Sequence, residues 1–290
     1  MTSSIEKAIQ RSESKTNEKS GVSQKMHAGS TDGAESELLG NENNRQCHVD
    51  LNELEKMGFL VPDSEQQMEM ADEYRIIKRP LLANAFGKGV VPVDNGNLIM
   101  VVSALPGEGK TFTAINLGMS MAMEMDTTVL VMDGDLINPA LSRVFGLEGK
   151  PGLVDLLLDQ NLDIGDVIYS TDIPKLKILP AGHSYHHSTE LLGGEEMSRV
   201  ANELSGRYND RIILVDAPPL LVTSQANVLA QHAGQILMVV EECKTPQQAV
   251  KEAISQLSED KVIGMVLNKS VQSSFGVYGG YYGGGYAGKK

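Results

Sequence analysis

The sequence lacks the features that mark secreted, membrane-spanning and nucleic-acid-binding proteins. Its two cysteines, Cys47 and Cys243, are far apart, so it offers neither a disulfide framework nor the ligand spacing of a zinc site. The sequence contains no run of about 20 apolar residues, which is the length that spans a bilayer. Its N-terminus also lacks the apolar core of a signal peptide. Acidic residues outnumber basic ones by 38 to 25, and the formal net charge of -13 disfavours binding to nucleic-acid phosphates. We therefore expect a cytoplasmic protein with no direct membrane span and no nucleic-acid partner.

The first 69 residues are expected to form a largely disordered region with short helices. The stretch up to about residue 44 is rich in Ser, Glu, Lys, Asn and Gly, and it cannot bury enough apolar surface to offset its ordering entropy. Apolar spacing predicts short helices near residues 5–9 and 51–57. A longer helix is predicted over 72–85, interrupted at Pro80.

From residue 97 the pattern is that of an α/β fold with a mostly parallel sheet flanked by helices. Short β-branched runs alternate with helical stretches, which indicates parallel strands buried on both faces. The predicted strands are 98–102, 128–132, 176–179, 212–215, 236–240 and 262–267. Helices are predicted after Lys110, after Gly152, over 189–204, after Thr223 and after Thr245.

A phosphate-binding loop lies between the first of these strands and the helix that follows it. Residues 104–111 read Ala-Leu-Pro-Gly-Glu-Gly-Lys-Thr, which departs from G-x-x-x-x-G-K-T only at Ala104. Alanine is tolerated there if its φ stays negative. The glycines let backbone N–H groups surround phosphate oxygens, the lysine reaches the β- and γ-phosphates, and the threonine hydroxyl can hold Mg²⁺. The residues expected to bind ATP in and beside the loop are Pro106, Gly107, Glu108, Gly109, Lys110, Thr111 and Phe112.

Carboxylates follow two other predicted strands, where the sheet should deliver them to the same crevice. Asp133 and Asp135 follow 128–132, and Asp216 follows 212–215. Ligands bind outside the carboxyl ends of strands in open parallel sheets, and magnesium takes one or two carboxylates together with phosphate oxygens. We therefore expect Mg-ATP, with Thr111, Asp135 and Asp216 as metal ligands.

Several motifs together resemble the bacterial tyrosine autokinases of capsule and exopolysaccharide synthesis. They are the loop at 103–111, Asp-x-Asp-Leu-x-x-Pro at 133–139, Glu-Leu-Leu at 190–192, Asp-Ala-Pro-Pro at 216–219 and Gly-Met-Val-Leu-Asn at 264–268. The resemblance covers roughly residues 70 to 290, and Glu-Tyr-Arg at 73–75 is similar to the subgroup encoded with exosortase systems. It implies a P-loop fold of the partition and positioning ATPase type, and the sequence contains no H-R-D or D-F-G kinase signature. By this resemblance Asn268 lies near the adenine.

The C-terminal residues 273–290 are expected to be a flexible autophosphorylation tail beyond a kinase domain at 70–272. Glycines separate its four tyrosines, Tyr278, Tyr281, Tyr282 and Tyr286, which leaves the phenols free to enter an active site. The proposed reaction is an in-line transfer of the γ-phosphoryl group to a phenol. Lys110, Asp133, Asp135 and Asp216 are the candidate catalytic residues. Asp133 is the candidate base, although it could exchange roles with Asp135.

Assembly and partners are implied by the resemblance alone. The family carries an E-x-x-R-x-x-R helix that joins subunits into rings, and the matching positions here are Asp72, Arg75 and Lys78. Lysine lacks the bidentate fork of arginine, so this pattern is only partly kept. The resemblance also implies a separate membrane protein of the chain-length regulator type, which would recruit the kinase to the inner face of the membrane and activate it.

Two other functions remain open from the residues. A P-loop switch ATPase could control assembly or positioning without phosphorylating tyrosine, but such relatives usually carry an extra lysine near the start of the loop, and residues 103–105 read Ser-Ala-Leu. A binding module that only senses ATP would require misplaced carboxylates. Regulation of exopolysaccharide polymerisation and export by a tyrosine autokinase is the main interpretation.

Overall fold

A single mixed sheet organises the part of the chain that the computed structural model describes. The described residues are 45–62, 64, 67–89, 92–207 and 210–270. The short helix predicted near residues 5–9 and the tail tyrosines lie outside them. No helix among these residues is long and apolar enough to cross a membrane.

Within the described residues, eight strands pair in the order β1-β4-β5-β3-β6-β2-β7-β8. All neighbouring pairs are parallel except β4 and β5. The strands are β1 (Arg45–Cys47), β2 (Leu98–Ser103), β3 (Thr128–Asp133), β4 (Tyr169–Thr171), β5 (Leu176–Leu179), β6 (Arg211–Asp216), β7 (Gln235–Glu241) and β8 (Val262–Asn268).

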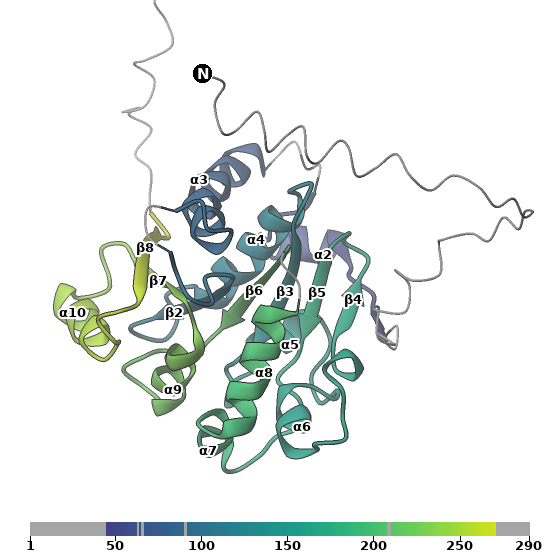
Figure 1. The fold of residues 1–290 in the computed structure, drawn as a ribbon. Coiled ribbons are helices and arrows are strands. Elements are labelled where there is room, and N and C mark those ends of the chain that lie inside the picture. Colours follow the sequence, from purple (N-terminus) through teal and green to yellow (C-terminus); the bar gives the residue numbers. More distant parts are fainter. Residues whose placement is uncertain (1–44, 63, 65–66, 90–91, 208–209, 271–290) are drawn as a thin grey trace, which may run out of the picture. The chain divides into compact units, whose positions relative to one another are not determined.

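Helices cover both faces of this sheet (Figure 1). One apolar layer joins alternate residues of β2 and β6 to α6 (Leu153–Leu158), α7 (Ser188–Leu192), α8 (Glu195–Gly206), α9 (Ser224–His232) and α10 (Gln247–Ser255). The other layer joins the remaining strand residues to α2 (Leu51–Lys56), α3 (Met68–Ala85), α4 (Lys110–Ala122) and α5 (Ala140–Val144). Because both faces of the central strands are covered, the strands read as continuous apolar runs.

The α/β prediction is confirmed, and each of the six predicted strands is present. No local pattern predicts β1 or β4, because each has three residues and neither is a β-branched apolar run. β1 pairs with β4. Cys47, the last residue of β1, and Val49, two residues further on, are buried. The interpretation of residues up to 69 as largely disordered therefore needs correction over 45–62. The boundaries at 69 and 272 stay predictions.

The helix predicted over 72–85 is longer than expected and is not interrupted at Pro80. α3 runs from Met68 to Ala85 through this proline. Proline removes the N–H that would bond to the carbonyl four residues earlier, at Ile76. Both Pro80 and Ile76 are exposed, so we infer that water replaces the lost partner.

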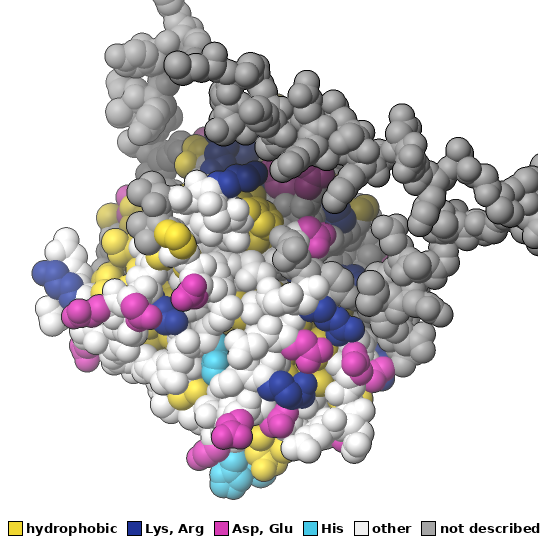
Figure 2. Space-filling model, in the orientation of Figure 1, with side chains coloured by type: hydrophobic (Ala, Val, Ile, Leu, Met, Phe, Trp, Pro, Cys, Tyr) yellow, Lys and Arg dark blue, Asp and Glu magenta, His cyan; other side chains and the backbone are white. Residues whose placement is uncertain are grey.

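Charges on the molecular surface are mixed. On the face drawn in Figure 2, Lys and Arg side chains are interspersed with Asp and Glu and do not gather in one basic patch.

Candidate active site

The predicted phosphate loop connects β2 to α4 at the carboxyl edge of the sheet. Gly107 and Gly109 have φ values of 83° and 96°, in the left-handed region that favours glycine. A Cβ atom on Gly109 would lie 2.1 Å from Nδ2 of Asn268, so a side chain there would require the Asn268 amide to move. Ala104 is buried and is not among the described residues with positive φ, which meets the condition for alanine at the first position.

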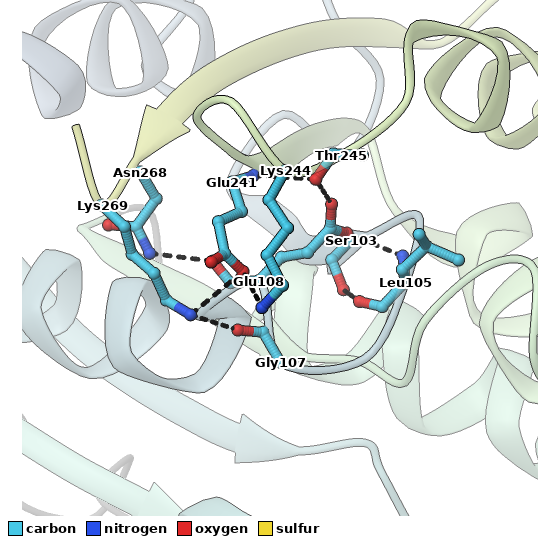
Figure 3. A network of polar contacts seen from close by, with 9 residues as sticks. All are labelled: Ser103, Leu105, Gly107, Glu108, Glu241, Lys244, Thr245, Asn268 and Lys269. Atoms are coloured by element: carbon cyan, nitrogen blue, oxygen red, sulfur yellow. Dashed lines mark hydrogen bonds and ion pairs between the residues drawn. The ribbon is translucent and has the colours of Figure 1, made fainter. Parts of the chain in front are cut away.

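Glu108 holds the loop in shape from within (Figure 3). Its side chain is buried and accepts hydrogen bonds from the backbone N–H of Leu105, at 2.7 Å, and from the hydroxyl of Thr245. Nδ2 of Asn268 donates to the Glu108 carbonyl at 2.9 Å. The Glu108 carboxylate is therefore committed to the loop, and only its backbone remains for a phosphate.

A lysine from the end of β8 supports the same loop. Nζ of Lys269 donates to the Gly107 carbonyl at 2.6 Å and lies 3.1 Å from Oε2 of Glu241. Lys244 also pairs with Glu241, at 3.2 Å (Figure 3). The loop is thus fixed by side chains from the ends of β7 and β8, about 140 to 160 residues further along the chain.

The three predicted carboxylates meet at this edge. Asp133 and Asp216 are paired in register at the ends of the neighbouring strands β3 and β6. Oδ2 of Asp135 lies 3.3 Å from Nζ of Lys110, and all three acids are buried. The structure therefore brings Lys110 and the three carboxylates together.

Burial shifts the ionisation of two of these acids. Desolvation raises the pKa of Asp216 from 3.8 to about 7, against the lowering effect of the Lys110 charge and with a further increase from Asp133. Desolvation likewise raises the pKa of Asp133 to about 6, while hydrogen bonds from Ser142 oppose the increase. Raised carboxylate pKa values in a site with one cation are typical of functional centres.

Ser142 was not predicted from the sequence, and it fixes Asp133. Its backbone N–H and its hydroxyl donate to Oδ2 of Asp133 at 2.8 and 2.7 Å, and its Oγ accepts from the N–H of Ala181 at 3.0 Å. Oδ1 of Asp133 accepts from the N–H of Asp135 at 3.3 Å. The helix α5 that carries Ser142 begins directly after Pro139, and that proline was the available sequence signal for a helix start.

Asp216 differs from the other two acids because the Lys110 charge and the nearby Thr111 side chain compensate its burial only in part. Both of its carboxylate oxygens are buried, and neither accepts a hydrogen bond of ordinary geometry from a residue that the structure describes. A buried carboxylate without partners is unfavourable, whereas Mg²⁺ binds carboxylate and water oxygens. With the Thr111 side chain close enough to lower its pKa, Asp216 fits a bound magnesium nucleotide.

The remaining predicted nucleotide residues lie at the β8 side of the loop. Asn268 contacts the loop through the Glu108 carbonyl, and its contact with adenine stays a prediction. The ring of Phe112 stacks on Phe59 with centroids 5.2 Å apart, so its side chain belongs to the packing between α4 and the N-terminal segment. Only the backbone of Phe112 therefore remains available to bind a phosphate.

The residues predicted to join subunits divide into two groups. Asp72 and Arg75 form an ion pair on α3, and both side chains are more than half exposed. Lys78 is buried, and its Nζ lies 2.6 Å from both the Ser120 carbonyl and Oε1 of Glu124. The prediction that Lys78 contacts another subunit is corrected, because its ammonium group is bound within its own chain.

This assignment predicts an asymmetry between two variants. Lys78→Met replaces the buried stem with an apolar chain and leaves Glu124, which is 44% exposed, to water. We expect a change of less than about 1.5 kcal/mol in the free energy of unfolding. Glu124→Gln leaves the buried ammonium without its counter-charge and should cost about 2 kcal/mol, discounted for solvent screening. Urea denaturation measures the two free energies of unfolding, and sedimentation measures the oligomeric state. If Lys78→Met alone changed the oligomeric state, Lys78 would contact another subunit as the sequence predicts.

Comparisons with known proteins agree with this geometry. Residues 96–271 match a family described as an AAA domain. The chain is 30% identical over 187 residues to tyrosine-protein kinase YwqD of Bacillus subtilis, covering 64% of this chain and 77% of YwqD. It is 32% identical over 200 residues to the succinoglycan biosynthesis transport protein ExoP of Rhizobium meliloti, covering 66% of this chain and 24% of ExoP.

A solved structure of the VpsO kinase domain aligns with a TM-score of 0.61 and 30% identity, covering 72% of this chain and 98% of that domain. The chain spans about a quarter of the length of the first curated relatives it matches, from Acinetobacter and Ralstonia.

Proposed function

Because this chain belongs to the bacterial tyrosine kinases that carry an AAA domain, we propose that it is an ATP-dependent protein-tyrosine autokinase. The observation that carries the proposal is the meeting of Lys110 with Asp133, Asp135 and Asp216 beside a phosphate loop. The acceptors are Tyr278, Tyr281, Tyr282 and Tyr286, which lie outside the described residues.

The loop and its lysine bind and orient the nucleotide. Backbone N–H groups of residues 107–112 face the phosphates, and Lys110 neutralises charge on the β- and γ-phosphates. Thr111, Asp135 and Asp216 hold Mg²⁺, which supplies charge neutralisation at the transferring group when bound. Asn268 contacts the base, as the resemblance implies. Asp216 is more available to a metal than Asp135, because Asp135 already pairs with Lys110 and accepts from the N–H of Asn138.

Asp133 orients the acceptor phenol and receives its proton. A phenol with a pKa near 10 is protonated at neutral pH and must lose its proton during the transfer. A pKa of about 6 makes Asp133 a stronger base than an ordinary carboxylate and still leaves it mostly ionised at pH 7. Its two bonds from Ser142 favour this positioning role over metal binding, which supports the division of roles between Asp133 and Asp135.

The cellular role is proposed from the name of a relative, and the assembly from the family resemblance of the sequence. ExoP is named for succinoglycan biosynthesis and transport, and we propose that this kinase regulates polymerisation or export of an exopolysaccharide. The partner is a separate membrane chain-length regulator whose cytoplasmic segment recruits and activates it at the membrane. Self-association uses the exposed Asp72 and Arg75, with Lys78 supporting α3 from inside. The exosortase-linked subgroup stays a prediction.

The proposal is tested by mapping phosphate on the purified full chain after incubation with Mg-ATP. A parallel reaction contains the cytoplasmic segment of the activator, and a variant with all four tail tyrosines changed to phenylalanine is the control. We expect phosphotyrosine at one or more of the four positions by peptide mass spectrometry and no signal in the control. Turnover of ATP with an unmodified tail in both reactions would favour the switch ATPase. ATP binding without turnover would favour the sensing module.

A further inference from the structure

One cavity shares the side chain of Ser142 with the hydrogen bonds of Asp133, and no step above uses it. Its volume is about 310 Å³, and it lies between the segment after β3 and the segment after β5. Its apolar walls come from Leu136, Ile137, Pro139, Val154 and Ala181. Cavities of this size suit a single small group, and an apolar lining with a few polar groups is typical of ligand sites.

The walls of this cavity are bonded directly to the catalytic groups. Asp135, immediately before the Leu136 wall, binds Lys110 through Oδ2 and the N–H of Asn138 through Oδ1. Ser142, which also lines the cavity, donates to Asp133. A group held in the cavity would therefore contact Ser142, the residue that positions the carboxylate of Asp133.

The chemical character of the cavity matches a phenol. Ile137 lines the cavity and is 67% exposed, so its apolar side chain is available to an occupant. The rim is polar: Arg143 binds Oδ1 of Asn138 at 2.6 Å, and Nδ1 of His183 lies 2.6 Å from Oδ1 of Asp155. Tyrosine combines an apolar ring with a polar tip, so it satisfies both parts of such a site.

We propose that this cavity binds the side chain of the acceptor tyrosine, one of the four in residues 278–286, and that Ile137 is its main apolar contact. The inference rests on the proposed kinase function. β8 ends at Asn268 against the phosphate loop, and an extended chain covers about 33 Å over the ten residues to Tyr278. Residues 273–290 carry no charge before Lys289, and glycines flank the tyrosines, so the segment can approach an apolar cavity closely.

The test uses the full chain as both enzyme and acceptor. The acceptor is the Lys110→Ala chain, and the enzyme carries phenylalanine at its own four tail positions, so that only transfer between molecules is counted. Ile137→Arg is made in the enzyme and compared with Ile137→Leu. Met125→Arg is the matched control, since Met125 is 89% exposed and lies before the start of β3, at the opposite end of that strand. ATP affinity is measured in parallel by calorimetry.

We expect Ile137→Arg to raise the half-saturating acceptor concentration about tenfold or more, with Ile137→Leu and Met125→Arg within about threefold of the parent enzyme. ATP affinity should be the same in all four enzymes. If the parent enzyme is active and Ile137→Arg and Met125→Arg have the same half-saturating acceptor concentration, this inference is overturned and the kinase function is not. Loss of ATP affinity in Ile137→Arg would also overturn the inference, because the substitution would then act on nucleotide binding through the nearby Asp135 and not on the acceptor. A parent enzyme that never labels the acceptor, together with an unmodified chain that forms no phosphotyrosine on its own tail, would overturn the kinase function and this site together.

Discussion

Replacing Lys110 with alanine is expected to abolish tyrosine phosphorylation, lowering its rate at least about a thousandfold. Lys110 is the cation paired with Asp135, and its charge also opposes the raised pKa of Asp216. Without it the incoming phosphates would meet three carboxylates and no compensating lysine. Both the binding of ATP and the stabilisation of the transferring group should fail.

The measurement is phosphotyrosine formation with Mg-ATP, together with circular dichroism to confirm that the variant is folded. Lys244→Ala is the matched control, because Lys244 belongs to the same loop network, its ion pair within the described residues is with Glu241, and its side chain is 71% exposed. We expect that control to retain activity within about threefold of the unmodified chain, as is usual for exposed ion pairs. Substantial phosphorylation by Lys110→Ala would remove the phosphate loop from the mechanism.

The features that sequence analysis predicted are those that local pattern determines. Central strands such as β2 and β6 are buried on both faces, and this burial requires continuous apolar runs that are visible in the sequence. The phosphate loop has a fixed spacing because its backbone must surround a phosphate. The carboxylates follow strand ends, and parallel pairing places strand ends together.

The features that sequence analysis missed depend on partners distant in the chain. β1 is a strand because β4 pairs with it, 124 residues away at Arg45 and Tyr169. Lys78 reads as an exposed charge on α3, but the Ser120 carbonyl and Glu124 allow its burial. Tertiary pairing can override local preference in this way, and one sequence contains no record of the partner.

The loop support shows the same limit inside the active site. Glu108 is among the loop residues that the sequence predicts to bind ATP. Its carboxylate instead accepts from Leu105 and Thr245, and the second of these comes from the segment after β7. Motif spacing predicts which backbone binds phosphate, but it does not predict which side chains hold that backbone in place.

Asp216→Asn is expected to have opposite effects on catalysis and on stability. Asparagine keeps the shape of the side chain but loses the negative charge that holds Mg²⁺, so phosphotransfer should fall at least about a hundredfold. In the metal-free protein the same change removes a buried carboxylate whose two oxygens lack hydrogen bonds within the described residues. The apoprotein should therefore become more stable.

The sign of the pH dependence follows from the raised pKa. The unfolded chain releases the Asp216 proton near pH 3.8, whereas the folded chain releases it at about 7. Between these values the folded state holds a proton that the unfolded state has lost, so the free energy of unfolding falls as pH rises. Above pH 7 the ionised Asp216 lowers the free energy of unfolding by its full amount, which is at most on the order of 4 kcal/mol. Asp216→Asn should lack this component, so its stability advantage should grow from pH 5 to pH 8.

Chemical denaturation in EDTA at several pH values measures this difference directly. Asp126→Asn is the control, since Asp126 is exposed in the segment before β3, at the opposite end of that strand from the active site. Adding Mg-ATP should stabilise the unmodified chain and the control but not Asp216→Asn. Only a carboxylate at this position binds the metal, and that binding offsets the cost of burying its charge. If Asp216→Asn were less stable than the parent at pH 8 in EDTA, Asp216 would have a structural partner and would not be held ready for a metal.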